Sequence, residues 1–223
     1  MKLLALDTAT EACSAALLLQ ETISERYEVI GRGHAERLLP MADGLLREAG
    51  IEIQGLDAIA FGRGPGGFTG LRIAAATAQG LAAGAGLPVL PVSDLAALAV
   101  AGARASGSSR VLACMDARMG QVYWAAYEVT GDEAAARSPE SLSAPASLAL
   151  PAGGPWFGAG HGFAAWPELA PRLGGALAGV DATLLPRAGD IARLAARGLR
   201  SGQALPASRA QPLYLRDEVV HKR

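Results

Sequence analysis

Cysteine and histidine are scarce in this sequence. Its 223 residues include two cysteines, Cys13 and Cys114, and three histidines, His34, His161 and His221. Both cysteines lie in apolar runs typical of strands, so we expect buried core residues rather than a disulfide or a metal pair. The histidines are scattered, without an H-E-x-x-H or H-x-x-x-H pair, so the sequence predicts no metal site and disfavours a metallopeptidase.

Charge of either sign is also limited. The chain has 20 basic and 21 acidic residues, a formal net charge of −1, and 51% hydrophobic residues. This composition argues against disorder, and it offers no basic field that would hold a nucleic acid electrostatically. We therefore expect weak or no direct binding of nucleic acid.

Long apolar runs are missing as well. No uninterrupted run reaches the roughly 18 residues that a membrane-spanning helix needs, and Asp7 interrupts the apolar N-terminus. We expect neither a signal peptide nor a membrane contact. With cysteines expected in the core, this indicates a reduced, cytoplasmic protein.

Apolar runs and turn-prone clusters predict an alternation of strands and helices typical of α/β proteins. The stretch 131–155 is expected to be irregular, and Pro40 is expected in the first turn of its helix or at a kink. Strands are expected at 3–6, 12–19, 23–30, 56–61, 88–92, 111–115, 121–129 and 156–158, helices at 34–49, 70–85, 94–105 and 190–199, and a last extended piece at 212–216.

Two hairpins resemble each other. LLALDTATEACSAALLL and VLACMDARMGQVYWAAY both place an aspartate, Asp7 or Asp116, after an apolar strand and before a turn. This suggests two similar lobes. With the small-residue stretch 102–109 as the boundary, we expect an N-terminal lobe at 1–105 and a C-terminal lobe at 106–223, whose last strand packs back on the first lobe.

The glycine-rich segment GRGPGGFTGLR, residues 62–72, lies between a predicted strand and a predicted helix. It matches G-x-G-x-x-G, but no acidic residue follows about 20 positions on, as a dinucleotide site would require. No lysine and hydroxyl pair follows either, so it is not a P-loop. We expect a turn that needs positive φ angles, with Arg63 and Arg72 solvated rather than bound to an anion.

The helix after this segment carries a stripe of small residues. Ala76, Gly80 and Gly84 recur every four residues and therefore share a face, which another helix could approach closely. Glycine in a helix interior costs about 1 kcal/mol relative to alanine, and a partner surface would explain that cost. The sequence leaves open whether the partner is in this chain or another. The candidate interface residues on this helix and on 34–49 are Leu38, Met41, Leu45, Ile73, Ala76, Thr77, Gly80, Leu81 and Gly84.

Asp7, Thr8 and Thr10 offer a carboxylate and two hydroxyls at the first hairpin turn. Such groups suit a phosphate with hydrated Mg²⁺, which makes a small-molecule kinase or ATPase the alternative function. A plain turn explains these residues equally well. His161, in the sequence GAGHG, is the histidine best placed for function, although we favour a role in its loop.

Four motifs carry a family resemblance: LALDTATEACSAAL, HAERLLPMADGLL, GRGPGGFTGLRIAAATAQGLA and PLYLRDEVV. In this order, over residues 3–220, they resemble the TsaB family, the dimerisation subunit of the bacterial machinery that places threonylcarbamoyl on adenosine 37 of tRNA. The match is specific in the glycine-rich run and loose from about 130 to 210.

The resemblance implies a two-lobed actin/Hsp70-like (ASKHA) α/β fold, each lobe a mixed sheet flanked by helices. It also implies a non-catalytic relative of the catalytic subunit TsaD, because the helix that would hold a paired-histidine metal site offers only His34. Asp7, Thr8 and Thr10 are then a vestigial phosphate hairpin. No cofactor is implied, although a nucleotide at a subunit interface is left open.

The same resemblance implies partners. A TsaD-type subunit, or a second copy of this chain, would dock on helices 34–49 and 70–85. A TsaE-type ATPase would join the heterodimer, and the threonylcarbamoyl-adenylate would be supplied separately.

Overall fold

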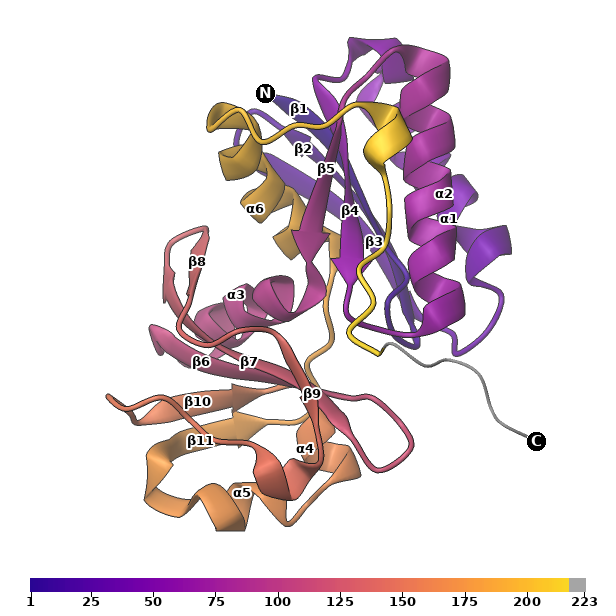
Figure 1. Cartoon of the computed structure of the whole chain (residues 1–223). Helices are drawn as coiled ribbons and strands as arrows, with labels where there is room; N and C mark the ends of the chain where they lie inside the picture. Colours follow the sequence, from indigo (N-terminus) through magenta and orange to yellow (C-terminus); the bar gives the residue numbers. More distant parts are fainter. Residues whose placement is uncertain (217–223) are drawn as a thin grey trace, which may run out of the picture.

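The computed structural model describes residues 1–216, which form two lobes, each built on one sheet (Figure 1). His221 and the end of the PLYLRDEVV motif lie outside the described residues. In the first sheet, with order β3-β2-β1-β4-β5, β1 is antiparallel to β2 and parallel to β4, and β4 is parallel to β5. The first-lobe strands are β1 (Lys2–Asp7), β2 (Ala12–Leu19), β3 (Thr22–Val29), β4 (Ala58–Gly64) and β5 (Val89–Ser93).

The second sheet repeats this topology. Its order is β11-β10-β6-β7-β8, where β6 is antiparallel to β7 and parallel to β10, and β10 is parallel to β11. The counterparts of β1 to β5 are therefore β6, β7, β8, β10 and β11, which confirms the two similar lobes predicted from the hairpins. The second-lobe strands are β6 (Arg110–Asp116), β7 (Val122–Thr130), β8 (Glu133–Ala136), β9 (Ser141–Ser143), β10 (Trp156–Ala159) and β11 (Leu177–Asp181).

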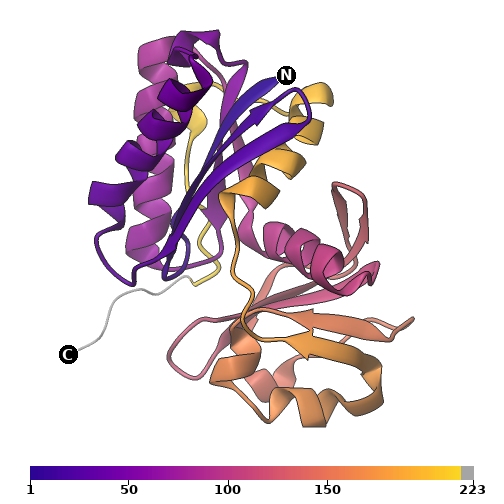
Figure 2. The ribbon, with the colours of Figure 1, turned by 180° about the vertical axis from the view of Figure 1, so that it is seen from behind.

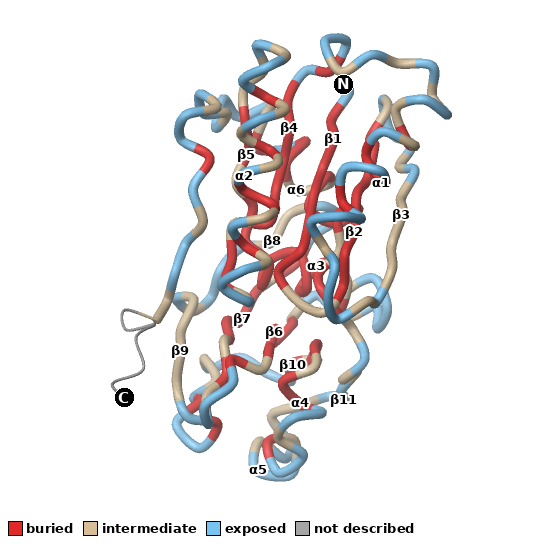
Figure 3. The backbone as a smooth tube through the Cα atoms, turned by 90° about the vertical axis from the view of Figure 1, so that its right-hand side faces the viewer, coloured by how far each residue is buried: buried red, intermediate tan, exposed pale blue. Residues whose placement is uncertain are grey.

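Helices cover both faces of the first sheet (Figure 2). Leu4 and Leu6 of β1 face the core beneath α1 (His34–Ala49) and α2 (Phe68–Ala85), whereas Leu3 and Ala5 face α6 (Ala188–Arg200). The strand is apolar throughout because alternate side chains enter two cores. Figure 3 shows β1 and β4 buried along most of their length, whereas β3 at the edge of the sheet is only partly buried.

The second sheet is also covered on both faces. α3 (Asp94–Ser106) packs on one, while α4 (Gly162–Ala165) and α5 (Leu169–Leu173) supply Phe163 and Leu169 to the other. The chain therefore crosses between lobes twice. α3 follows β5 but packs on the second sheet, and α6 follows β11 but packs on the first. The first sheet is thus covered by a helix, α6, that comes after residue 105. The domain boundary expected between residues 105 and 106 stays a prediction.

Helix boundaries were predicted well where periodicity is strong. α1 spans His34–Ala49 as expected. The Ser93 hydroxyl caps α3 by accepting a hydrogen bond from Ala96 N at 3.1 Å. Of the two positions expected for Pro40, the first turn was wrong, since Pro40 lies inside α1, and a kink there stays a prediction. Cys13 and Cys114 are free, fully buried core residues, as predicted.

The expectation that 131–155 is irregular was wrong in part. β8 and β9 pair with β7 in this stretch. β8 has the sequence EAAA, which has low strand propensity, so backbone pairing with β7 rather than local preference makes it a strand. β11, α4 and α5 are short and were not predicted either. Among residues 1–216, no helix combines the length and hydropathy that crossing a bilayer requires.

Candidate functional site: the interlobe cleft and the face of α1 and α2

The glycine-rich segment is built for close packing against the β1–β2 turn. A Cβ on Gly70 would collide with Thr8 O, and one on Gly66 would lie 2.5 Å from Ala9 O. The Thr8 hydroxyl donates to Gly70 O at 2.7 Å. This supports a packing turn rather than a phosphate cradle. Only one glycine of the segment, Gly64, has a positive φ, of 113°, so close approach explains more of these glycines than conformation does.

The expectation of a solvated side chain was wrong for Arg63, which is half-buried, whereas Arg72 is exposed, as expected. Arg63 makes a bidentate pair with Glu140 of the second lobe, with nitrogen–oxygen distances of 3.0 and 3.2 Å. The Arg72 guanidinium lies 3.7 Å from the centre of the Phe68 ring, and its Nε donates to the Tyr214 hydroxyl at 3.0 Å. The sequence could not reveal either contact, because the partners lie 77 and 142 residues away.

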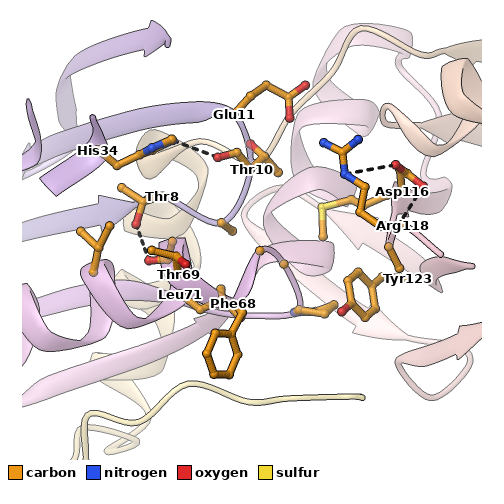
Figure 4. A pocket seen from close by; sticks show the side chains of 18 of the residues that line it. Thr8, Thr10, Glu11, His34, Phe68, Thr69, Leu71, Asp116, Arg118 and Tyr123 are labelled. Carbon is orange, nitrogen blue, oxygen red and sulfur yellow. Dashed lines mark hydrogen bonds and ion pairs between the residues drawn. The ribbon is translucent and has the colours of Figure 1, made fainter. Parts of the chain in front are cut away.

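A cleft of about 920 Å³ separates the lobes. Thr10 and Glu11 of the first lobe line it opposite Asp116, Arg118 and Tyr123 of the second (Figure 4). The walls carry charges of both signs, so the cleft does not present a single-sign field to an anionic ligand.

The vestigial phosphate hairpin is only partly in this cleft. Thr8 and Thr10 line the cleft, but the Thr8 hydroxyl donates to Gly70 O and the Thr10 hydroxyl accepts from Ala12 N. Asp7 is fully buried and does not line the cleft. The side chains of the three residues therefore do not face one common binding site.

His161 lies between β10 and α4 and lines the cleft. Burial lowers its pKa, and its Nδ1 has no hydrogen-bond partner among residues 1–216. His34 is far from it in sequence and points its Nε2 at Thr10 O, 3.0 Å away. Within the described part of the chain, no group of three or more His, Cys, Asp or Glu side chains could hold a metal ion.

Leu38, Met41 and Leu45 of α1, which the sequence assigned to the interface, do not lie at the surface of this chain. All three are buried in the core between α1 and the sheet, with exposed fractions of 0%, 5% and 3%. The reason is the 3.6-residue period itself, which identifies the face toward the chain's own core. A residue outside that stripe, Leu39, is 47% exposed and is the better surface candidate on this helix.

The small-residue stripe of α2 faces outward. Its sheet-facing side is Leu71, Ala74, Ala75, Ala78 and Ala82, and Ala76, Gly80 and Gly84 are exposed on the other. A Cβ added to Gly80 or Gly84 would meet nothing within 4 Å. No helix of residues 1–216 therefore covers this stripe, which removes the intramolecular explanation for it.

An apolar groove runs beside this stripe, between α1 and α2. It has a volume of about 830 Å³. Leu81 of α2 lines it, whereas the half-buried Ile73 lines the interlobe cleft and the half-buried Thr77 lines neither. Most of the groove could not be found from the sequence, because its residues are spread over α1, α2 and the loop after α1. Its apolar lining includes Leu39, Pro40, Leu46, Ile51, Ile53 and Leu81.

The last described residues, 213–216, form a strap between the lobes. Leu213 N donates to Arg63 O at 2.6 Å on the first lobe. On the second lobe, Arg216 donates to Ala117 O at 3.1 Å and to Gln121 Oε1 at 2.8 Å. The strap lines the cleft, so it helps to hold both walls in place.

Known proteins resemble this chain along its whole length. The tRNA threonylcarbamoyladenosine biosynthesis protein TsaB of Escherichia coli K12 is 40% identical over 230 residues, which cover 100% of this chain and 98% of the relative. Its namesake in Haemophilus influenzae is 37% identical over 234 residues, which cover 100% and 97%. A structure described as YeaZ from Pseudomonas aeruginosa matches with a TM-score of 0.90 at 47% identity, over 96% of this chain and 99% of that chain.

A family model described as TsaD, tRNA N6-adenosine threonylcarbamoyltransferase, matches residues 18–161. With the repeated sheet topology, these matches confirm the predicted two-lobed actin/Hsp70-like fold. The chain thus belongs to the TsaB family of tRNA threonylcarbamoyladenosine biosynthesis proteins, within the wider TsaD family.

Proposed function

We propose that this chain is a non-catalytic subunit that docks and supports a TsaD-type catalytic subunit during threonylcarbamoyl transfer to adenosine 37 of tRNA. The observation that carries the proposal is the outward face of α2, where Gly80 and Gly84 stand in open space beside an apolar groove. A helix pressed against this face could reach the α2 backbone and fill the groove. Exposed glycines there lower helix stability, which a partner would offset.

The assigned surface differs from the one expected from the sequence. It keeps the α2 residues Ile73, Ala76, Thr77, Gly80, Leu81 and Gly84, and it replaces the buried α1 residues by Leu39, Pro40 and Leu46. A flat, small-residue centre with an apolar rim suits a helix pair better than a peptide or a nucleic acid. A second copy of this chain would occupy the same face when the catalytic subunit is absent.

The absence of catalysis is proposed because the candidate chemical groups do not converge. The Asp7 carboxylate is buried away from the cleft, and the Thr8 and Thr10 hydroxyls bond to the backbone. The near-neutral charge balance favours tRNA contacts made by the partner rather than by this chain. In this scheme a TsaE-type ATPase joins the heterodimer, and the complex works in the cytoplasm.

The docking surface is tested by Gly80→Leu. The leucine side chain would project from α2 and hold a partner helix away, while the free chain still folds because nothing lies near that Cβ. We expect the mixed complex with the catalytic subunit to disappear in size-exclusion chromatography, with unchanged thermal unfolding of the free variant. Gly175→Leu, at another open glycine but on the second lobe, is the matched control and should bind normally.

Two outcomes would contradict the proposal. If Gly80→Leu co-elutes with the catalytic subunit as the wild type does, the docking surface is elsewhere. If reconstituted tRNA modification runs at full rate without this chain, the supporting role itself is wrong.

A small-molecule kinase or ATPase is the second candidate, favoured by the interlobe cleft of about 920 Å³. Calorimetry of the isolated chain with Mg-ATP separates the two functions. Micromolar binding with turnover supports the kinase, whereas binding that appears only in the complex supports a nucleotide at the subunit interface.

A further inference from the structure

Two carboxyl groups are buried together where the first lobe meets α3. Asp7 ends β1, Asp94 begins α3, and both are fully buried. Asp7 Oδ1 accepts a hydrogen bond from Ala9 N at 2.9 Å, and Asp94 Oδ2 accepts one from Gly64 N at 2.5 Å. Within residues 1–216, the other oxygens, Asp7 Oδ2 and Asp94 Oδ1, have no hydrogen-bond partner. Each carboxyl therefore has one satisfied and one orphaned oxygen.

The orphaned oxygens are explained if one carboxyl is protonated. The two side chains are adjacent, because a Cβ added to Gly62 would meet both Asp94 Oδ1 and Asp7 Oδ1. Two carboxylates cannot bond to each other, because both only accept, but a carboxylic acid donates to a carboxylate. Gly62 of β4 packs directly against the pair, and a Cβ there would collide with Asp94 and lie 2.7 Å from Asp7 Oδ1. The glycine thus closes the pair off on its β4 side.

The surrounding charges do not neutralise two carboxylates. The neighbouring titratable groups are Cys13 on β2 and Glu25 and Tyr27 on β3. The negative charge of Glu25 raises the pKa of Asp7, and the nearby cation Arg187 is already paired with Glu25 at 2.8 Å. On β4, the cation that acts on Asp94 is Arg63. Its guanidinium is already in the bidentate pair with Glu140. Two adjacent, buried negative charges would therefore be strongly disfavoured.

We propose that Asp7 and Asp94 share one proton, carried by Asp94, and that this proton fastens the start of α3 to the glycine-rich segment. In this state Asp94 Oδ1 donates to the Asp7 carboxylate while Asp94 Oδ2 keeps Gly64 N. The pair carries a single negative charge. Loss of the proton leaves two carboxylates in contact and drives Asp94 away from Gly64, which loosens the junction between the lobes. Asp7 is then a structural acid rather than a ligand for phosphate.

The pair has a definite effect on stability against pH. Burial raises the pKa of both carboxyls, and the neighbouring Asp7 charge raises the pKa of Asp94 further. The folded chain therefore holds the proton more tightly than the unfolded chain, in which the pKa of aspartate is about 3.9. This contribution to stability is present at low pH and is lost as pH rises through the raised pKa of the folded pair.

Thermal unfolding of the full chain from about pH 5 to about pH 9 tests the shared proton. In Asp94→Asn, the amide oxygen still accepts from Gly64 N, and the amide N–H₂ donates to Asp7 at every pH. We expect the Tm of this variant, relative to the wild type, to rise steadily with pH. Asp116→Asn, at the counterpart of Asp7 in the second lobe, should follow the wild-type slope, because Asp116 is paired with the Arg118 guanidinium at 3.7 Å rather than with a second carboxyl.

Infrared spectroscopy gives an independent readout. The wild type at neutral pH should show the carbonyl stretch of a protonated, buried carboxylic acid. The intensity of this band should fall by the contribution of one carboxyl group in Asp94→Asn. It should fall equally in Asp7→Asn, where the new amide donates to Asp94. Asp116→Asn should keep the band.

Parallel Tm curves for Asp94→Asn and the wild type would overturn the proposal, and so would an unchanged infrared band in both pair variants. If one variant does not fold, the other still decides. A wild-type spectrum without a protonated carboxyl at neutral pH is sufficient to reject the shared proton.

Discussion

In each lobe, a different glycine-rich segment follows a strand of the sheet and packs against the end of the central strand. In the first lobe β4 ends at Gly64, with φ of 113°, and in the second β10 leads into Gly160, with φ of 114°. In both, later glycines abut the end of the central strand: Gly70 packs on Thr8, and Gly162 packs on Cys114. The glycine turn is therefore part of the duplicated frame, which favours a structural over a phosphate-binding origin for it.

The lobes differ in the helix that comes after this turn. In the first lobe it is α2, which has 18 residues, and in the second it is α4, which has only four. The first hairpin turn is packed against the glycines, whereas the turn of the second exposes Met119 to 68%. The long, uncovered helices belong to the first lobe alone. The two lobes therefore share a frame, and the helical face is the specialised part of the first.

The largest effect is expected where the first-lobe turn is packed most tightly. Gly70→Ala places a Cβ against the backbone oxygen of Thr8, which cannot rotate away. We expect a loss of about 3 kcal/mol or more in the free energy of unfolding. Urea denaturation measures this loss. Gly84→Ala, on the outward face of the same helix, is the control and should not destabilise the chain. A loss below about 1 kcal/mol for Gly70→Ala would show that the β1–β2 turn yields easily.

A smaller effect is expected at the link between the lobes. Arg63→Ala removes the bidentate pair with Glu140, whose side chains are only 27% and 14% exposed. We expect a loss of about 2 kcal/mol, because charged hydrogen bonds shielded from water are the stronger ones. A double-mutant cycle with Glu140→Ala isolates the coupling. The matched pair Arg37 and Glu28 is also bidentate but more exposed to solvent, and it should show a much smaller coupling. Equal couplings for the two pairs would contradict the interlobe role.

The smallest change in the free energy of unfolding is expected on the outward face of α2. Gly80→Ala adds a methyl group to open space and removes the conformational cost of glycine. We expect the free chain to gain about 1 kcal/mol, visible as a higher urea midpoint, while complex formation is kept because alanine stays small. A destabilised Gly80→Ala chain would mean that this face is not open in solution.

The fold was largely predictable because its signals are local and periodic. The limits of α1 and the likeness of the two hairpins both depend on short stretches of sequence. β8 and β11 were missed because their strand conformation comes from pairing with β7 and β10, which no local pattern encodes. The paired glycines of GRG and GAG, each following an apolar strand, were a further signal of duplication that the sequence offered.

The sequence identified the small-residue stripe of α2 as a packing face, but it left open whether the partner lies in this chain or another. The structure shows that the stripe is exposed. On α1 the apolar period selected Leu38, Met41 and Leu45, which serve the chain's own core. Periodicity finds the core first, and a surface leucine such as Leu39 is recognised only as an apolar residue that is out of phase with it.

The exchange of α3 and α6 between the sheets has a consequence for how the chain can be divided. Cutting after residue 106 would leave α3 without the sheet on which it packs and would leave the first sheet without α6. The apolar face of β1 formed by Leu3 and Ala5 would then be open to water. The lobes are distinct in topology, yet neither is a separable folding unit, so a cleaved or half-length product of this gene would not yield one working lobe.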